Sequence, residues 1–273
     1  METQYSVLMS VYYKEKPEYL KEAMHSIFDQ TVPTNDLVLV CDGPLNVGLD
    51  EVINEMQEKH IDVLHVYRLE KNQGLGNALN FGLKHCRNEL VARMDSDDIS
   101  RKDRCERQLK IFENNPEISI CSGTVEEFSD NKESVDALRV VPETNEEIIE
   151  FAKKRNPFNH PCVMYKKSAV EAAGNYQDFY LLEDYYLWVR MILKKYKGYN
   201  IQNPLLSMRA GSDMYKRRSG WNYTKSQRKL FLFMRNHGMI DKKLYIKNCV
   251  IRSIASLIPN VVRKLVFEKV LRQ

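Results

Sequence analysis

The stretch LVARMDSDDIS, residues 90–100, joins a continuous apolar run to three aspartates, Asp95, Asp97 and Asp98. A continuous apolar run is typical of a strand buried on both faces of a parallel sheet. Carboxylates gathered at the end of such a strand repel one another and cost free energy to desolvate. The stretch therefore predicts an α/β sheet with a ligand site at the edge where this strand ends.

Similar apolar runs recur on either side of this stretch, and helical patterns alternate with them. Strands are expected at 5–13, 37–43, 61–69, 88–95 and 117–125, and helices at 17–30, 50–60, 74–86 and 101–115. This alternation predicts a mostly parallel sheet with helices on both faces. Beyond residue 125 the pattern is looser. We expect the polar segment 128–147 to contain a surface loop, and we expect a strand and short helix at 160–174 and a helix at 183–196.

Ligands of such sheets bind beyond the carboxyl ends of the strands. Four unusual segments fall there, namely Ser10–Tyr13, Asp42-Gly43, Asn72–Gly76 and the acid cluster. A solvated turn explains any one of them, and for the Asp-Gly pair alone that explanation is favoured. The four segments together predict a binding site.

The three aspartates suit a hard divalent cation. Mg²⁺ and Mn²⁺ favour carboxylate oxygens, and a metal held this way neutralises a pyrophosphate and stabilises it as a leaving group. A calcium EF-hand loop is excluded, because Ile99 occupies its fifth position and Ser100 occupies the sixth, which requires glycine. Capping of the next helix by Asp98 or Ser100 explains one side chain and not the whole cluster.

The glycine segment Asn72–Asn77 has two interpretations. It lacks the third glycine of a dinucleotide fingerprint and follows the third strand instead of the first, and no Gly-Lys-Ser/Thr of a Walker loop follows it. A helix that begins at glycines approaches a phosphate closely. A tight strand-to-helix turn explains the same residues equally well.

Length and composition limit the class of protein. The 273 residues, 43% of them hydrophobic, suit one large domain or one domain with an appendage. We expect no signal peptide in the first residues and no membrane span, because no apolar run reaches the roughly 20 residues required. Six cysteines without C-x-x-C pairs are interpreted as reduced packing residues and not as a zinc site: Cys41, Cys86, Cys105, Cys121, Cys162 and Cys249.

Charge is distributed unevenly along the chain, whose net charge is +4. From Met214 onward, 15 Lys/Arg oppose two acids, so a basic segment follows an acidic body. Apolar residues at helical spacing, from Ile251 to Val266, alternate there with basic ones on both sides of Pro259. Basic amphipathic helices bind anionic membrane surfaces, and packing on the body or on a partner subunit is the alternative.

In this order, the segments SVLMSVYYKE, VCDG, NQGLGNALNFGL and ARMDSDDIS resemble the nucleotide-binding half of family 2 glycosyltransferases. NPFNHPCVMYKKSAVEAAGNY and LLEDYYLWVRM resemble the acceptor half, so the likeness spans residues 5–210. Within the family the chain is most similar to bacterial transferases that build O-antigen or capsular repeat units. The resemblance implies a GT-A fold at 1–213, with a donor half at 1–125 and an acceptor half at 126–213, followed by basic helices at 214–273.

The resemblance also implies residue roles. Asp95 faces the donor ribose, Asp97 binds Mn²⁺ or Mg²⁺, and Asp98 supports them. Asp184 is the general base and Glu183 its partner. Other donor-binding positions are Ser10, Val11, Tyr12, Asp42 (toward the uracil), Asn72, Gly74, Asn77, Arg93 and Ser96. His160 and Trp188 are acceptor-side candidates, with a structural histidine and a core tryptophan as alternatives, and Lys216, Arg217 and Arg218 are candidates for a pyrophosphate contact.

The resemblance also implies transfer with inversion at the anomeric carbon, and the chemistry of such a transfer supports the base assignment. One carboxylate must take the proton of the acceptor hydroxyl, and no second carboxylate need act as a nucleophile. Complementarity with the helix dipole also explains the Glu183-Asp184 pair. The surrounding motifs favour catalysis over that explanation.

We therefore expect a metal-dependent enzyme that moves a hexose from a UDP-sugar to an undecaprenyl-diphosphate-linked saccharide. Galactose is the best guess from the resemblance, with glucose and N-acetylhexosamine open. The enzyme is expected in the cytoplasm, peripherally bound to the inner face of the plasma membrane, with no nucleic acid partner. One alternative is a sugar nucleotidyltransferase. Such an enzyme would carry a glycine- and basic-rich pyrophosphate loop after the first strand, and the segment SVYYKEKPEYL does not resemble one. The other alternative is a nucleic-acid-binding module, which leaves the acid cluster unexplained.

Overall fold

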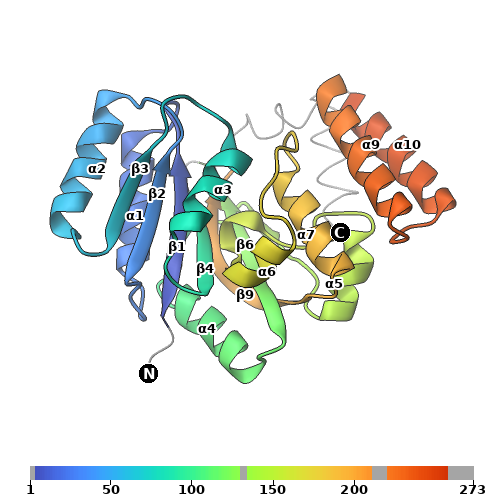
Figure 1. Cartoon of the computed structure of the whole chain (residues 1–273), viewed down its shortest axis with the longest axis horizontal. Coiled ribbons are helices and arrows are strands. Elements are labelled where there is room, and N and C mark those ends of the chain that lie inside the picture. Colours follow the sequence, from blue (N-terminus) through green and yellow to red (C-terminus); the bar gives the residue numbers. More distant parts are fainter. Residues whose placement is uncertain (1–3, 130–133, 211–219, 258–273) are drawn as a thin grey trace.

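The computed structural model describes residues 4–129, 134–210 and 220–257 (Figure 1). Its strands are β1 (Tyr5–Val11), β2 (Asp36–Cys41), β3 (Leu64–Arg68), β4 (Leu90–Asp95), β5 (Ile99–Ser100), β6 (Ile118–Phe128), β7 (Ala137–Arg139), β8 (Met164–Lys166) and β9 (Lys197–Arg209). Its helices are α1 (Pro17–Phe28), α2 (Val47–Lys59), α3 (Leu75–His85), α4 (Arg104–Asn114), α5 (Asn145–Ala152), the 3-10 turn η1 (His160–Cys162), α6 (Lys167–Ala172), α7 (Glu183–Leu193), α9 (Trp221–Asn236) and α10 (Lys242–Leu257).

One sheet runs through the molecule in the strand order β3-β2-β1-β4-β8-β6-β9-β5, and β7 pairs with β6. β3, β2, β1 and β4 are parallel neighbours, which confirms the interpretation of the first half of the chain. β8 runs antiparallel between β4 and β6, so the fifth expected strand does not pair directly with the fourth. The sheet is therefore parallel in its N-terminal half and mixed beyond it.

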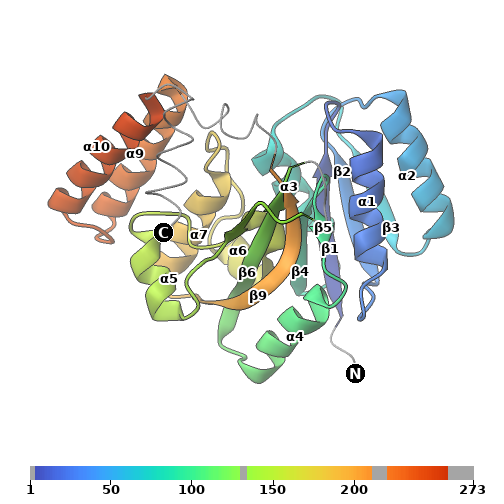
Figure 2. The same ribbon diagram turned by 180° about the vertical axis from the view of Figure 1, so that it is seen from behind.

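Helices cover both faces of this sheet. α3, α6 and α7 lie on the face seen in Figure 1, and α1, α2 and α4 lie on the face seen in Figure 2. Along β1, Met9 packs under the second group of helices and Leu8 under the first. α3 approaches so closely that a Cβ atom on Gly82 would lie 2.5 Å from the Leu8 side chain. Burial on both faces explains why these strands are continuous apolar runs.

The segment 128–147, expected to contain a surface loop, also contains elements that the sequence pattern does not predict. The segment contains β7 and the start of α5, where Thr144 and Glu147 form a capping box. The long strand β9 is a further element that the sequence pattern does not predict. Pro204 interrupts its alternation, in a stretch where the pairing with β6 shifts register between Gly123 and Val125.

α9 and α10 lie side by side beyond α7, at the end of the molecule opposite α2 (Figure 1). An apolar cluster that includes Phe179, Val189 and Phe231 joins α9 to α7. No helix in the described ranges is long and apolar enough to cross a membrane. Residues 211–219, which contain the expected domain boundary, and residues 258–273 of the basic segment lie outside the described residues, so those expectations stay predictions.

Candidate active site

The sheet order brings the carboxyl ends of β3, β2, β1 and β4 to one edge. Ser10 of β1 lies beside Asp95 of β4 in the strand register, and Val11 lies beside Cys41 of β2. Val11 is buried, whereas Ser10 and Tyr12 are partly exposed. The segments expected to bind the donor therefore meet at this edge, where Ser10 and Tyr12 are accessible to a ligand.

Asp42, directly after β2, organises the loop that follows β3. Its carboxylate accepts hydrogen bonds from the backbone N–H groups of Gln73 at 2.7 Å and Gly74 at 3.0 Å, and from the Asn72 side-chain amide at 3.0 Å. Asn77, in the first turn of α3, donates to the Gln73 carbonyl at 2.9 Å. The carboxylate of Asp42 thus fixes the loop shape and is itself buried, so its expected contact with the uracil stays a prediction.

Asp95, Asp97 and Asp98 form a compact carboxylate cluster between β4 and β5. One oxygen from each lies within 4.8 Å of the others. Burial, and then the charges of the nearby Asp95 and Glu15 carboxylates, raise the pKa of Asp97 to about 7. The Asp98 Oδ2 atom is buried without a hydrogen-bond partner among the described residues. Three carboxylates packed together, with one oxygen that lacks a hydrogen-bond partner, suit Mg²⁺ or Mn²⁺, which prefer oxygen ligands.

The capping interpretation of the acid cluster is wrong. α4 begins at Arg104, its N-cap residue is Asp103, and neither Asp98 nor Ser100 caps it. Asp98 is buried, and its Oδ1 atom instead accepts the backbone N–H of Arg209 at 2.9 Å. Asp98 is therefore tied to β9 and not to the helix that follows it in sequence.

Ser96 lies in the turn of the acid cluster and is also buried. Its hydroxyl donates to the Glu15 carboxylate at 2.9 Å, so the segment that follows β1 contacts the turn that carries the acid cluster. Glu15 lies within the SVLMSVYYKE segment of the family resemblance, although no role is expected for it from sequence. Its contact with Ser96 is the signal that places it in the site.

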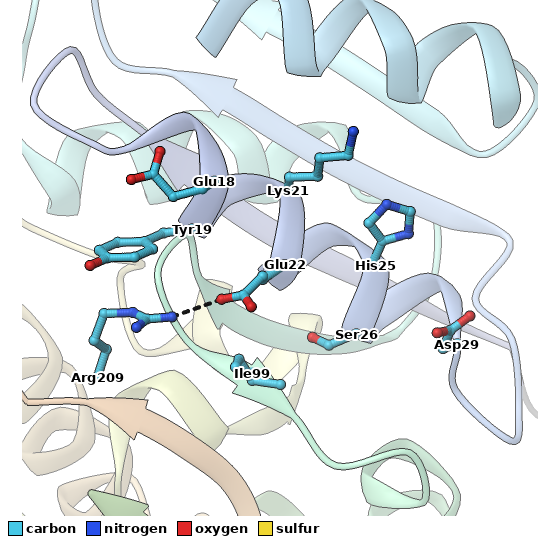
Figure 3. A pocket seen from close by; sticks show the side chains of 9 residues that line it. All are labelled: Glu18, Tyr19, Lys21, Glu22, His25, Ser26, Asp29, Ile99 and Arg209. Carbon is cyan, nitrogen blue, oxygen red and sulfur yellow. Dashed lines mark hydrogen bonds and ion pairs between the residues drawn. The ribbon is translucent and has the colours of Figure 1, made fainter. Parts of the chain in front are cut away.

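Arg209, at the end of β9, is a second residue that sequence reasoning missed. Its Nε–H group donates to the Asp97 carbonyl at 3.2 Å, and its Nη2 atom pairs with Glu22 of α1 at 2.9 Å (Figure 3). The guanidinium lies 3.7 Å from the centroid of the Tyr19 ring and 4.7 Å from that of Phe128. These contacts anchor the acid turn to α1 and β6 from a residue that shares no motif with it.

Glu183 and Asp184 lie in the first turn of α7. The Asn156 amide donates to the Asp184 carboxylate at 2.6 Å, and the Tyr185 N–H group donates to it at 2.7 Å. Burial, and then the Asp184 charge, raise the pKa of Glu183 to about 7. A Cβ atom on Gly76 would lie 3.3 Å from the Glu183 Cβ, so the acid pair adjoins the start of α3 and the donor edge.

Arg93 lies between the two acid groups, within the sheet. It is almost completely buried and pairs with Asp95, and its Nε and Nη1 atoms lack partners among the described residues. Its positive charge lowers the pKa values of Asp97 and Glu183 in part, although burial dominates and raises both. Because its side chain is buried, Arg93 supports the carboxylates electrostatically and does not present itself to a large ligand.

His160 and Trp188 belong to a buried aromatic cluster. The His160 Nε2 atom is hydrogen-bonded to the Tyr176 hydroxyl at 3.1 Å, and burial, with the nearby Arg93 charge, lowers the pKa of His160 well below its usual range. Trp188 is completely buried and packs edge-on against Phe158. These positions favour the alternatives of a structural histidine for His160 and a core tryptophan for Trp188. Lys216, Arg217 and Arg218 lie outside the described residues.

Comparison with known proteins identifies the family of this arrangement. Residues 6–173 match the family described as glycosyl transferase family 2. The chain is 40% identical over 268 residues to the amylovoran biosynthesis glycosyltransferase AmsE of Erwinia amylovora, across 97% of this chain and 98% of that protein. It is 37% identical over 269 residues to an Escherichia coli protein named UDP-Gal:alpha-D-GlcNAc-diphosphoundecaprenol beta-1,3-galactosyltransferase, across 98% of this chain and 97% of that protein.

A solved structure shares the fold. The mannosyltransferase PcManGT of Pyrobaculum calidifontis, determined in complex with GDP-Man and Mn²⁺, superposes with a TM-score of 0.65 at 14% identity, covering 98% of this chain and 80% of that one. At this identity the likeness establishes the GT-A architecture of the chain and nothing about its ligands.

Proposed function

Because the chain belongs to glycosyl transferase family 2, we propose that this glycosyltransferase moves galactose from UDP-galactose to a sugar on undecaprenyl diphosphate, with inversion. The donor and acceptor are those in the name of the Escherichia coli relative, which matches this chain over nearly its full length. AmsE is named for the synthesis of another bacterial polysaccharide, which supports a role in O-antigen or capsule synthesis.

The donor lies along the edge formed by Ser10–Tyr12, Asp42 and the 72–77 loop. Asp95 faces the ribose, and Asp97, with Asp95 and Asp98 beside it, holds Mn²⁺ or Mg²⁺ through carboxylate oxygens. The bound metal neutralises the diphosphate of the leaving UDP. Arg93 forms an ion pair with Asp95 but not with Asp97 or Asp98 among the described residues. A bound cation would lower the remaining repulsion between the carboxylates, which supports this assignment.

The acid pair at the start of α7 carries the proposal for the chemical step. Asp184 is held by the Asn156 amide and adjoins the donor edge through the contact of Glu183 with α3. Asp184 takes the proton of the acceptor hydroxyl as its oxygen attacks the anomeric carbon from the face opposite UDP. The bond between that carbon and the UDP oxygen breaks, and UDP leaves with the electron pair.

We further propose that the enzyme binds peripherally to the cytoplasmic leaflet, where a lipid-linked acceptor would be reached. α10 exposes Ile246, Val250 and Ile254, each between 49% and 56% accessible, one helical turn apart or nearly so. Neither α9 nor α10 contains an acidic residue. An apolar stripe on a basic helix pair is the pattern of an interfacial membrane anchor.

A screen for UDP release tests the reaction. The protein is incubated with Mn²⁺, a synthetic N-acetylglucosamine-diphosphate-lipid and each of several UDP-sugars in turn. We expect UDP release to depend on acceptor and metal, and to be fastest with UDP-galactose. Fastest release with UDP-glucose or a UDP-N-acetylhexosamine would keep the enzyme class and overturn the donor.

A further inference from the structure

A groove lies outside the acid clusters, between the loop that precedes α7 and the helix α9. Its volume is about 410 Å³, and it is lined by Asp178, Phe179, Tyr180, Asn222, Lys225, Ser226 and Lys229. None of these residues has a role in the donor site or in the proton transfer described above. The groove is therefore a second place where a ligand can bind near the active site.

Both walls of this groove are held in place. The Ser226 hydroxyl of α9 donates to the Tyr180 carbonyl of the loop at 2.8 Å. The Phe179 ring is 5% exposed and packs in the apolar cluster with Leu230 and Phe231 of α9. The groove is thus a built feature of the fold, with the exposed Tyr180 ring at its rim.

Two lysine ammonium groups give the groove a positive charge. Lys225 and Lys229 lie one helical turn apart, and the Lys229 Nζ atom lies 5.0 Å from the centroid of the Phe179 ring, toward the loop. Among the described residues neither ammonium pairs with a carboxylate, including that of Asp178 on the opposite wall. Like charges four residues apart destabilise a helix slightly, and an anion between them removes that repulsion.

The groove adjoins both the loop before the acid pair and the helix α9, which packs against the helix with the proposed membrane surface. Tyr180 precedes Asp184 by four residues, so their Cα atoms are at most about 15 Å apart. The same loop contacts the donor side, since the Gln177 carbonyl would lie 3.2 Å from a Cβ on Gly76. On its other side, α9 packs against α10, which carries the exposed apolar stripe.

We propose that Lys225 and Lys229 bind the diphosphate of a lipid-diphosphate-linked sugar acceptor, with the Tyr180 ring beside the acceptor sugar. The inference rests on the proposed function, since it takes the lipid-linked acceptor from there. In such an acceptor the diphosphate joins the sugar to the lipid, so it must lie between the accepting hydroxyl and the membrane. The groove occupies that place, and lysine ammonium groups are suitable partners for phosphate oxygens.

The test compares two acceptors that differ only in the diphosphate. One is N-acetylglucosamine diphosphate on a short alkyl chain, and the other is the neutral alkyl glycoside of the same sugar and chain, both in neutral detergent. In the Lys225→Gln/Lys229→Gln variant we expect KM for the diphosphate acceptor to rise about 10–100-fold, from the loss of two charge-assisted contacts. KM for the neutral glycoside and for the UDP-sugar should stay within twofold of wild type.

A matched control removes two exposed lysines at the far end of α7. Lys194→Gln/Lys195→Gln makes the same change in net charge, and we expect it to leave both acceptor KM values unchanged. Titration calorimetry of the diphosphate acceptor without donor gives the same comparison independently of turnover.

Three results would overturn the inference. An unchanged KM for the diphosphate acceptor in the double variant would show that the lysines only face solvent, and an equal rise for both acceptors would show a general loss of structure. Weaker binding to anionic vesicles with an unchanged diphosphate KM would assign the lysines to the lipid surface. Wild-type protein that transfers to neither acceptor would instead refute the proposed function.

Discussion

Arg209 is distant in sequence from the acid cluster but holds the turn that carries it. It bonds to Asp98 and Asp97 from 111 and 112 positions away in sequence, and its charge is paired with Glu22 instead of the cluster. We expect Arg209→Lys to lose the Nε bond to the Asp97 carbonyl and to leave that turn less fixed. Mn²⁺ affinity in the presence of UDP should fall about tenfold, as measured by electron paramagnetic resonance.

The control for this variant is Arg101→Lys. Arg101 forms a pair with Glu126 at 2.7 Å near the same sheet edge. In the described part of the chain it makes no hydrogen bond or ion pair with the acid turn, so its replacement should leave Mn²⁺ affinity unchanged. If Arg209→Lys lowers the melting temperature and keeps wild-type Mn²⁺ affinity, Arg209 stabilises the fold and does not position the turn.

Glu183 gives a prediction about pH. Its pKa in the folded protein, about 7, lies above its ordinary value of 4.5, so folding favours the protonated form. That contribution to stability is complete below the ordinary value and is lost as the pH rises through 7. Glu183→Gln should therefore melt about 3 °C or more above wild type at pH 8, with a difference that shrinks toward zero at pH 4. The measurement is calorimetry in chelator, and an equal difference at both pH values would contradict the assignment.

At the scale of the elements, the first half of the chain is predicted more completely than the second, where the helix expected at 183–196 is confirmed as α7. Strands β1 to β4 read as continuous apolar runs because helices bury both of their faces. The strand and short helix expected at 160–174 correspond to β8 and α6, whereas β9 is missed because Pro204 interrupts it at its register shift. The capping box of α5, Thr144 to Glu147, is present in the sequence and would have located that helix.

The candidate site divides in the same way. Asp42, Asp95 and Asp97 follow strands that can be recognised, so their meeting at one edge can be predicted from topology. Glu15 and Asn156 lie within recognised segments, but their contacts with the Ser96 hydroxyl and the Asp184 carboxylate depend on the tertiary fold and cannot be read from the sequence. Arg209 has no local signal, because only the pairing of β9 with β5 and β6 brings it to the turn.

α10 carries the prediction for membrane binding. Replacing its exposed residues, as Ile246→Ser/Val250→Ser/Ile254→Ser, removes the apolar stripe and leaves Leu244 and Tyr245, which pack toward α7 and α9. We expect affinity for vesicles that contain anionic lipid to fall at least about tenfold, because each aliphatic side chain contributes apolar area to insertion. Sedimentation with vesicles at low and high salt measures this loss.

The matched control alters exposed apolar residues at the opposite end of the molecule. Val47→Ser/Ile61→Ser replaces side chains that are 74% and 75% exposed near the two ends of α2. This variant should sediment with vesicles as wild type does. Equal binding by the α10 variant and wild type would assign the stripe to contact with another protein surface.

At the scale of the whole molecule, the parts follow one another in an order that suits transfer at a lipid surface. The strands β1 to β4, the helix α7 and the helix pair α9 and α10 follow one another across the fold (Figure 1). The strands carry the donor edge, α7 the acid pair, and the helix pair the lysine groove and the apolar stripe. The charge of the chain follows the same order, from an acidic body to a basic C-terminal segment. This arrangement would place the acceptor hydroxyl between the donor and the membrane.

The central claim is that Asp184 takes the proton of the acceptor hydroxyl. The most direct measurement is the turnover of Asp184→Asn with UDP-galactose, Mn²⁺ and the diphosphate-lipid acceptor, together with its affinity for UDP. The account predicts that kcat falls by about 10²–10⁴-fold while UDP affinity stays within twofold of wild type. A kcat within a few-fold of wild type would contradict it.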